Sequence, residues 1–319
     1  MPLRLPFWRL SAAFVLLLGL AGPGWAEDAK PAPATPSAPA AKIRVVATFS
    51  ILADFVSQVG GDRVAVTSLV QPNADAHGYA PAPSDAKTLA DANLVVVNGL
   101  GFEGWLDRLI KASGTKAPVV VASAGVKPIE AEDDDHAHHG HGHHDDPHAW
   151  QSIANARIYV GNIRDALERI DPAHAATYAA NAKAYLGTLD ALESDVRAAI
   201  AAIPKAQRRI ITTHDAFGYF TAAYGLTFIA PQGISTDSEA SPRDVARIIR
   251  QIRQEKIPAV FLENISDPRL MQQIARESGA VIGGKVFSDA LSGPHGPAPT
   301  YVAMMRNNVS AFTAALGKR

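Results

Sequence analysis

The sequence of 319 residues contains no cysteine. This absence excludes a fold held together by disulfide bonds, and it also excludes a lipid attached through a cysteine sulfur. An excess of either charge is missing too, because 30 lysine and arginine residues are balanced by 31 aspartate and glutamate residues. A near-neutral chain has no electrostatic footprint for nucleic acid, so we expect no nucleic-acid partner.

The N-terminus has the pattern of a secretory signal peptide. Arg4 and Arg9 precede an apolar run over residues 10–21, and small residues mark a cleavage site after Ala26. The apolar run is well short of the roughly 20 residues that span a bilayer. We therefore predict a signal peptide over residues 1–26 and a mature, monomeric protein that lies in the periplasm without a lipid anchor.

Beyond the signal peptide the chain divides by composition. Residues 27–41 are rich in alanine and proline and are predicted to form a disordered tether. From residue 42 onward, apolar runs of strand length alternate with helical stretches, which predicts parallel sheets flanked by helices. We expect an α/β fold with two lobes, over residues 42–170 and 205–319. A rigid linker helix over residues 171–204 would join them, about 45 Å long at 1.5 Å per residue.

Histidines gather in one loop. Seven of the eleven histidines lie between His136 and His148, mixed with acidic residues and glycines. Imidazole and carboxylate together suit divalent first-row metals, so the loop over residues 131–147 is predicted to bind metal weakly. Its accessory ligands would be His136, His138, His139, His141, His143 and His144. His148 differs, because a proline and a tryptophan beside it give the backbone a defined course.

Four single residues fall just beyond predicted strand ends, two in each half of the chain: His77, His148, His214 and Asp289. Each one alone has an ordinary explanation as a turn or helix-capping residue. In parallel sheets, however, ligands bind beyond the carboxyl ends of the strands, so two facing lobes would bring the four together. Three imidazoles and one carboxylate form a complete tetrahedral set for Zn²⁺. Such a closed set has no position for a reactive water, which predicts metal holding and no catalysis.

These residues lie in four motifs: DAHGYAP (75–81), DPHAW (146–150), THDAFGYF (213–220) and FSDALS (287–292). In this order the motifs resemble the ligand motifs of the zinc and manganese solute-binding proteins of bacterial ABC importers. The resemblance extends from Ile43 to the C-terminus and departs at Ala76, where a proline is usual. It implies two α/β lobes, a rigid linking helix and one metal in the cleft. His77 and His148 would come from the N-terminal lobe, His214 and Asp289 from the C-terminal lobe, and an ABC permease subunit would receive the metal.

The third ligand position helps to predict the metal. Manganese-handling members of the family tend to carry a carboxylate there, whereas this chain has His214. Imidazole in place of oxygen shifts the preference toward zinc, and a histidine-rich loop is typical of the zinc branch. We therefore expect Zn²⁺ as the transported ligand, with Mn²⁺ as the alternative and a periplasmic metallochaperone as a further partner.

Some neighbouring residues and two other functions stay open. His295, in a Gly-Pro loop, could replace Asp289 as the fourth ligand, although such a loop would hold its side chain less rigidly. Tyr79, Trp150 and Glu263 are expected around the ligands, where they could exclude water and support the imidazoles. An exported zinc store or chaperone would bind metal mainly through the histidine-rich loop. A zinc hydrolase is the least favoured alternative, because the sequence contains no HExxH motif.

Overall fold

The structure, a computed structural model, describes residues 41–130 and 145–317. Three predicted features lie outside these residues: the signal peptide over 1–26, nearly all of the tether over 27–41, and the six accessory histidines from His136 to His144. Within the two described ranges, no helix is both long enough and apolar enough to cross a membrane.

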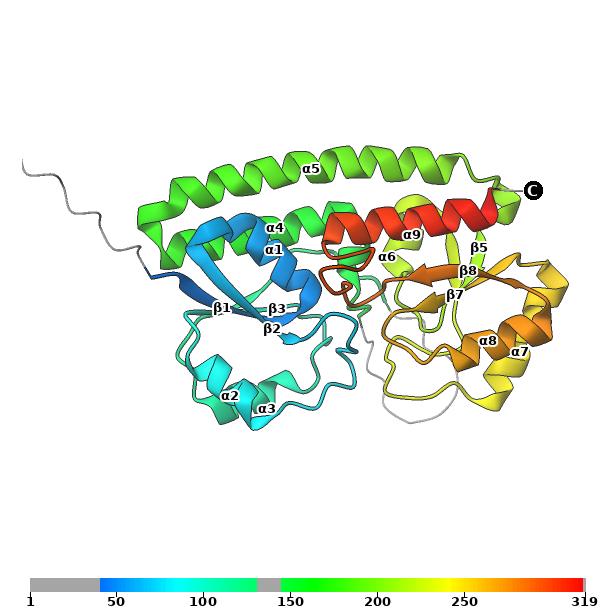
Figure 1. Cartoon of the computed structure of the whole chain (residues 1–319), viewed down its shortest axis with the longest axis horizontal. Coiled ribbons are helices and arrows are strands. Elements are labelled where there is room, and N and C mark those ends of the chain that lie inside the picture. The colour runs from blue at the N-terminus through cyan, green and yellow to red at the C-terminus, as the bar shows by residue number, and fades with distance from the viewer. Residues whose placement is uncertain (1–40, 131–144, 318–319) are drawn as a thin grey trace, which may run out of the picture. The chain divides into compact units, whose positions relative to one another are not determined.

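The first half of the described chain builds a four-stranded parallel sheet in the order β2-β1-β3-β4 (Figure 1). Its elements, in chain order, are β1 (Ile43–Phe49), α1 (Ser50–Gly60), β2 (Val64–Val70), α2 (Pro83–Ala90), β3 (Leu94–Val97), α3 (Leu106–Ser113) and β4 (Val119–Val121). All four residues of β3 are buried, and so are the last five of β1. Strands covered on both faces need apolar residues at every position, which explains the unbroken valine runs of the sequence.

The second half repeats this topology with the order β6-β5-β7-β8, again fully parallel. Its elements are β5 (Arg209–Ile211), α6 (Gly218–Tyr224), β6 (Thr227–Ile229), α7 (Pro242–Glu255), β7 (Ala259–Glu263), α8 (Arg269–Ser278) and β8 (Val281–Val286). The prediction of two parallel-sheet α/β lobes is confirmed. The predicted limits of the lobes stay a prediction.

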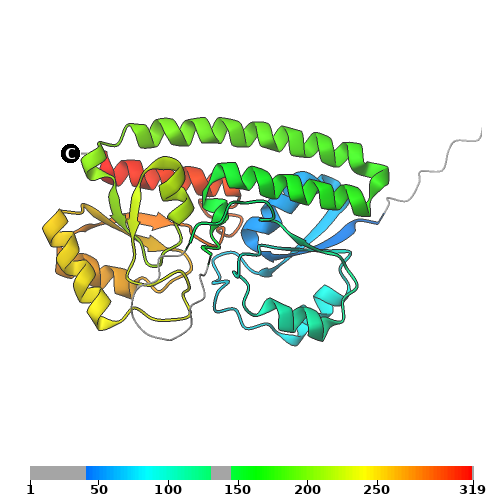
Figure 2. The same ribbon diagram turned by 180° about the vertical axis from the view of Figure 1, so that it is seen from behind.

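A layer of three helices runs along both sheets. It consists of α4 (Ile153–Ile170), α5 (Ala175–Ala201) and α9 (Tyr301–Leu316). Helix α5 has 27 residues, about 40 Å at 1.5 Å per residue, and it packs against α1, α4 and α9. Both views show it extending over the two sheets, with α4 and α9 beneath it (Figures 1 and 2). The long helix predicted between the lobes is therefore present, and the C-terminal helix reinforces it.

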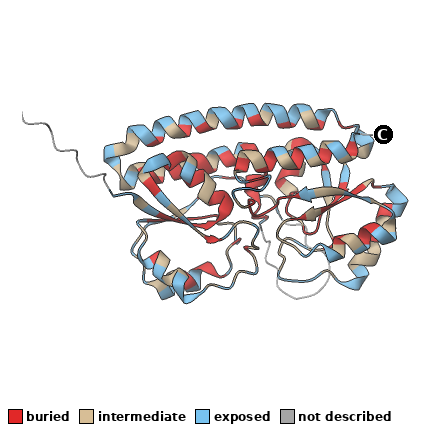
Figure 3. Ribbon diagram, viewed as in Figure 1, coloured by how far each residue is buried: buried red, intermediate tan, exposed pale blue. Residues whose placement is uncertain are grey.

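The buried residues of the first sheet, of the helical layer and of one face of the second sheet form one continuous apolar cluster. Figure 3 shows these buried residues concentrated between the helices and the sheets. A smaller cluster, including Ile248, Ile252 and Met271, lies between the second sheet and helices α7 and α8. Close-packed interiors deform little, so a core shared by both halves resists a wide hinge motion between them.

Candidate metal centre

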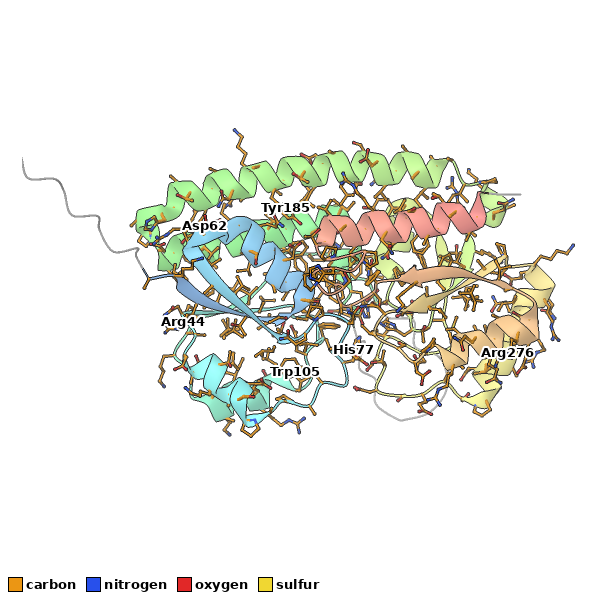
Figure 4. The ribbon with its side chains drawn as sticks, viewed as in Figure 1. Arg44, Asp62, His77, Trp105, Tyr185 and Arg276 are labelled. Carbon is orange, nitrogen blue, oxygen red and sulfur yellow. The ribbon has the colours of Figure 1, made fainter. Side chains whose placement is uncertain are left out.

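Four side chains that are distant in sequence converge at one point: His77, His148, His214 and Asp289. A nitrogen or carboxylate oxygen from each lies within 4.8 Å of those of the other three. Figure 4 shows His77 in the middle of the molecule, between the ribbons of the two sheets.

Three of these residues occupy loops at the carboxyl ends of strands. His77 follows β2, His214 follows β5 and Asp289 follows β8. His148 does not follow a strand directly. It precedes a short 3-10 helix, η2 (Ala149–Gln151), and the chain approaches it from an isolated antiparallel bridge between Glu130 and Asp145. The expectation that all four lie just beyond strand ends is therefore wrong for His148, because its backbone course is set by the turn.

The distances between the four side chains match the size of a small metal ion. The Nε2 atoms of His77 and His148 are 3.2 Å apart. Asp289 Oδ2 lies 3.3 Å from His77 Nε2 and 3.1 Å from His214 Nε2, and Asp289 Oδ1 lies 3.6 Å from His148 Nε2. Ligand atoms around a tetrahedral Zn²⁺ with bonds of about 2.0–2.1 Å are roughly 3.3 Å apart. The four ligand pairs with these distances, of 3.1–3.6 Å, are therefore close enough for one small metal ion to contact all four side chains.

The cluster is withdrawn from solvent. The imidazole of His77 is 5% exposed, and the side chains of His148, His214 and Asp289 have no exposure. Neither carboxylate oxygen of Asp289 makes a hydrogen bond within the described part of the chain, and neither does His214 Nε2. Burying such groups without partners is costly, and a cation bound between them would satisfy all of them at once.

Two buried carboxylates orient two of the imidazoles. Asp146 Oδ1 lies 2.8 Å from His148 Nδ1 and also accepts the His148 backbone N–H. Glu263 Oε2 lies 2.5 Å from His214 Nδ1, and its other oxygen accepts the backbone N–H groups of Thr213 and His214. A carboxylate beside Nδ1 holds the proton there and leaves the lone pair of Nε2 facing the cluster. Both imidazoles are thus already oriented to bind a metal.

The first histidine is held differently, through its backbone. The N–H of His77 donates to Asp75 Oδ1 over 2.9 Å, and the other Asp75 oxygen accepts the hydroxyl of Thr236 over 2.6 Å. The ring of His77 meets the ring of Phe102 edge-on, with 4.8 Å between centroids. His77 is half-buried as a residue, and it is the ligand candidate nearest to solvent.

The buried charges shift the pKa values of two cluster members. Burial lowers the pKa of His214, but the carboxylates of Glu263 and Asp289 outweigh burial and hold this pKa well above its usual range. Burial raises the pKa of Asp289, but the imidazoles of His214 and His148 outweigh it and hold this pKa well below its usual range. The carboxylates of Glu263 and Asp289 thus favour a positive charge at this point of the structure.

The neighbours expected from the sequence divide into two groups. Glu263 contacts His214 as described, and the ring of Trp150 lies 5.3 Å from that of His148. The indole N–H of Trp150 donates to the carbonyl of Ser288, next to Asp289. Tyr79, by contrast, is not beside the ligands.

The hydroxyl of Tyr79 donates to Asp85, and its ring packs on Trp105, whose own N–H donates to the carbonyl of Ala76. This aromatic pair supports the His77 loop from behind. Sequence reasoning missed Phe102 altogether, because a phenylalanine in a loop gives no signal of the ring that it contacts. It also missed the contact of Asp146 with His148, although the spacing of two residues could have suggested it.

The structure also bears on the choice of the fourth ligand. Asp289 lies in the cluster, whereas His295 is exposed in a turn and is not among the groups of potential metal ligands that the described residues form. The Gly-Pro loop carries His295 away from the three imidazoles.

The two parallel-sheet lobes and the buried cluster of three imidazoles and one carboxylate are the features of a protein that can hold a metal ion. Comparison with known proteins gives the family. Residues 45–315 match the family described as zinc-uptake complex component A, periplasmic (ZnuA), and the chain belongs to this family.

Individual relatives agree over nearly the whole chain. The iron-binding protein YfeA of Yersinia pestis is 35% identical over 316 residues, 99% of each chain. The manganese-binding lipoprotein MntA of Halalkalibacterium halodurans is 34% identical over 86% of this chain and 89% of its own. The solved structure of the periplasmic zinc binding protein TroA of Treponema pallidum superimposes with a TM-score of 0.81 at 29% identity, covering 87% of this chain and 100% of its own.

The protein is therefore the periplasmic metal-binding component of an ABC importer, and its partner is the membrane part of such a transporter. The prediction that it is not an enzyme is confirmed by this membership, because the family consists of substrate-binding components of transporters.

One expectation is corrected by the same relatives. The sequence predicted a periplasmic protein without a lipid anchor, whereas several relatives, among them the protein from Halalkalibacterium halodurans, are named lipoproteins. The prediction rested on the missing cysteine and the short apolar run, which are features of composition and do not reveal how the family is held at the membrane. The expectation of an unanchored protein is therefore wrong, and placement outside the cytoplasm is unaffected.

Proposed function

We propose that this protein captures Zn²⁺ with His77, His148, His214 and Asp289 and delivers it to an ABC permease. The convergence of three imidazole nitrogens and one carboxylate at a buried point carries the proposal. Imidazole ligands favour Zn²⁺ over Mn²⁺, since affinities for nitrogen sites rise from manganese toward copper and zinc. The spacing of the ligand atoms and the orientation of two imidazoles by carboxylates support the same metal.

A manganese or iron carrier is the second candidate. Relatives named for iron and manganese favour it, and so does one feature of the site. Both oxygens of Asp289 face imidazole nitrogens, so this carboxylate could bind through both oxygens and give the larger coordination number that Mn²⁺ and Fe²⁺ accept. We prefer zinc, because a nitrogen ligand at His214 replaces the oxygen that those metals favour.

Competition between the metals tests this choice. Metal-free protein would receive one equivalent of Zn²⁺ together with a hundredfold excess of Mn²⁺ or, without oxygen, Fe²⁺, and native mass spectrometry would identify the bound ion. We expect one zinc per chain under both conditions, and an anomalous-scattering map across the zinc edge should place it between the four ligands. Manganese or iron bound in place of zinc under these conditions would contradict the zinc proposal and leave the family function intact.

Capture needs no covalent chemistry and little motion. Since both halves share one core, we propose that the two lobes of the monomer keep their positions relative to α5. The metal then enters by a local movement of the loops that carry the ligands. In this proposal the two lobes span residues 42–170 and 205–319, and the linker helix spans residues 171–204. A periplasmic metallochaperone supplies the metal.

Glu263→Gln is expected to weaken zinc binding at least tenfold. The amide oxygen would still accept the backbone N–H groups of Thr213 and His214, but the amide nitrogen would replace Oε2 and donate to His214 Nδ1. The imidazole proton would then move to Nε2 and block the metal, and changes at such supporting residues typically cost 10–100-fold in metal affinity. Chelator competition measures the loss.

Glu193→Gln is the matched control for this substitution. Glu193 is a partly buried carboxylate that accepts the hydroxyl of Tyr224, away from the ligands. Its variant should bind zinc as the unaltered protein does. Equal affinity in both variants would contradict the role given to Glu263.

Deletion of residues 134–144 separates the proposed function from metal storage. If the loop is accessory, the shortened protein keeps one tight zinc in the cleft and loses only weak sites contributed by the six histidines. Equilibrium dialysis of the deleted and complete chains would count both classes of site. Loss of all tight zinc on deletion would instead favour a store or chaperone.

A further inference from the structure

A hydrogen bond of the Asp75 side chain joins the His77 loop to the other half of the chain close to the metal site. Asp75 Oδ2 accepts the hydroxyl of Thr236, which lies between β6 and α7 and is 161 residues away in sequence. Asp75 Oδ1 accepts the backbone N–H of His77. One carboxylate therefore fixes the proposed first ligand with one oxygen and reaches across to the second half with the other.

This contact differs from those that hold the remaining ligands. Asp146 and Glu263, the carboxylates behind His148 and His214, are buried, whereas Asp75 and Thr236 are both half-buried. Burial keeps water from competing for a hydrogen bond, so the half-buried contact exchanges with water more readily. Of the contacts that position the ligands, the one serving His77 is therefore the easiest to break.

The start of the same loop is fixed separately. The N–H of Asn73 donates to the carbonyl of Leu291, and its side-chain oxygen accepts from Asn264. Asn73 has a φ of 60°, a left-handed conformation that few residues other than glycine adopt, and this marks a sharp turn of the backbone. The part of the loop that carries His77 begins beyond this turn, and the Asp75 contact holds it.

The contact also borders a cavity. Asp75 and Thr236 both line a polar cavity of about 690 Å³ that extends to Thr213, the residue before His214. The hydroxyl of Thr213 is buried and makes no hydrogen bond within the described residues. The cavity therefore borders both the contact that holds the His77 loop and the residue before His214.

We infer that Thr236 is a positioning residue that acts through Asp75 to hold His77 on the metal and thereby sets the rate of metal release. This inference rests on the proposed function, because it requires His77 to be a ligand. Release then begins with displacement of the His77 loop toward the cavity, and the shared core need not open.

Release kinetics of the full chain test the inference. Protein loaded with one equivalent of Zn²⁺ would be mixed in a stopped-flow instrument with an excess of a chromophoric chelator. Thr236→Val, which keeps the shape and removes the hydroxyl, should release zinc roughly tenfold faster, the effect of losing a hydrogen bond to a charged group. Thr236→Ser, which keeps the hydroxyl, should release it at the rate of the unaltered chain.

A double-substitution cycle shows whether Thr236 acts through Asp75. Asp75→Ala should speed release at least as much as Thr236→Val, and the double variant should be no faster than Asp75→Ala alone. Thr188→Val is the control: it makes the same change on the exposed face of α5, where the hydroxyl bonds only within its helix, and it should leave release unchanged. Melting of the metal-free proteins should show no difference between Thr236→Val and Thr188→Val.

Each contrary result has a distinct meaning. Release from Thr236→Val at the unaltered rate, or additive effects in the double variant, overturns the inference while the metal site stands. Failure of the unaltered chain to hold one tight zinc, or unchanged binding by His77→Ala, overturns the proposed function and the inference with it. A metal-free Thr236→Val protein that melts well below Thr188→Val and is not rescued by Thr236→Ser would show a general structural role, which also overturns the inference.

Discussion

Replacing His77 by alanine is expected to lower the affinity of the cleft for Zn²⁺ by about a hundred- to a thousandfold. Four-ligand zinc sites bind with about 10–16 kcal/mol in all, so loss of one ligand removes a quarter of this, and each 1.4 kcal/mol is a factor of ten. Of the four ligands, His77 can be replaced with the least disturbance of the fold, because its loop is half-buried. Replacing His148 or His214 would also leave the buried carboxylate of Asp146 or Glu263 without its imidazole partner, whereas His77 has no such partner. Chelator competition at one equivalent of metal measures the change.

His295→Ala is the control for this experiment. It removes an exposed histidine from a turn outside the ligand cluster, and its affinity should equal that of the unaltered chain. The metal-free melting temperature of His77→Ala should also be unchanged, which separates loss of a ligand from loss of the fold. Undiminished affinity in His77→Ala would contradict the assignment of this site.

Much of this architecture could be predicted because its physical causes are local. Strands covered on both faces require apolar residues throughout, and β3 is a run of such residues. Helical stretches are predicted between the apolar runs, and α4 over Ile153–Ile170 is one of the helices found. The positions of His77, His214 and Asp289 follow from the topology, since the carboxyl ends of parallel strands lie at one edge of each sheet. A sequence pattern of this kind reveals where strands end, and hence where a site can be built.

The remaining features depend on how distant segments pack. Spacing along the chain cannot show that Phe102 lies against His77, or that Tyr79 turns away from the ligands toward Trp105. The contact between Asp75 and Thr236 exists only because the two halves meet. The return of helix α9 along α5 was likewise invisible, because an amphipathic helix does not reveal its partner. A linker helix could be predicted, but the shared core could not.

Removal of the metal is expected to lower the melting temperature by about 10 °C. A ligand that binds only the folded state stabilises it by about 4.1 kcal/mol when its free concentration is a thousand times the dissociation constant. For domains of about 150–250 residues, each kcal/mol shifts the melting temperature by about 2–4 °C. The structural reason lies at Asp289, whose two buried oxygens make no hydrogen bond to the described chain and stand beside the equally unbonded Nε2 of His214. A bound cation satisfies these groups in the folded state alone.

Calorimetry of chelator-treated protein, before and after addition of metal, measures the shift and also ranks the metals. If three imidazoles determine the preference, Zn²⁺ should raise the melting temperature more than Mn²⁺ at equal free concentration, and the order should reverse if Asp289 binds through both oxygens to a larger shell. In His77→Ala the zinc-induced shift should fall to between about a third and a tenth at the same free zinc concentration, because free zinc would then be only about one to ten times the dissociation constant. An undiminished shift of the melting temperature in that variant would show that the stabilising metal binds elsewhere. The histidine-rich loop would then be the next site to test.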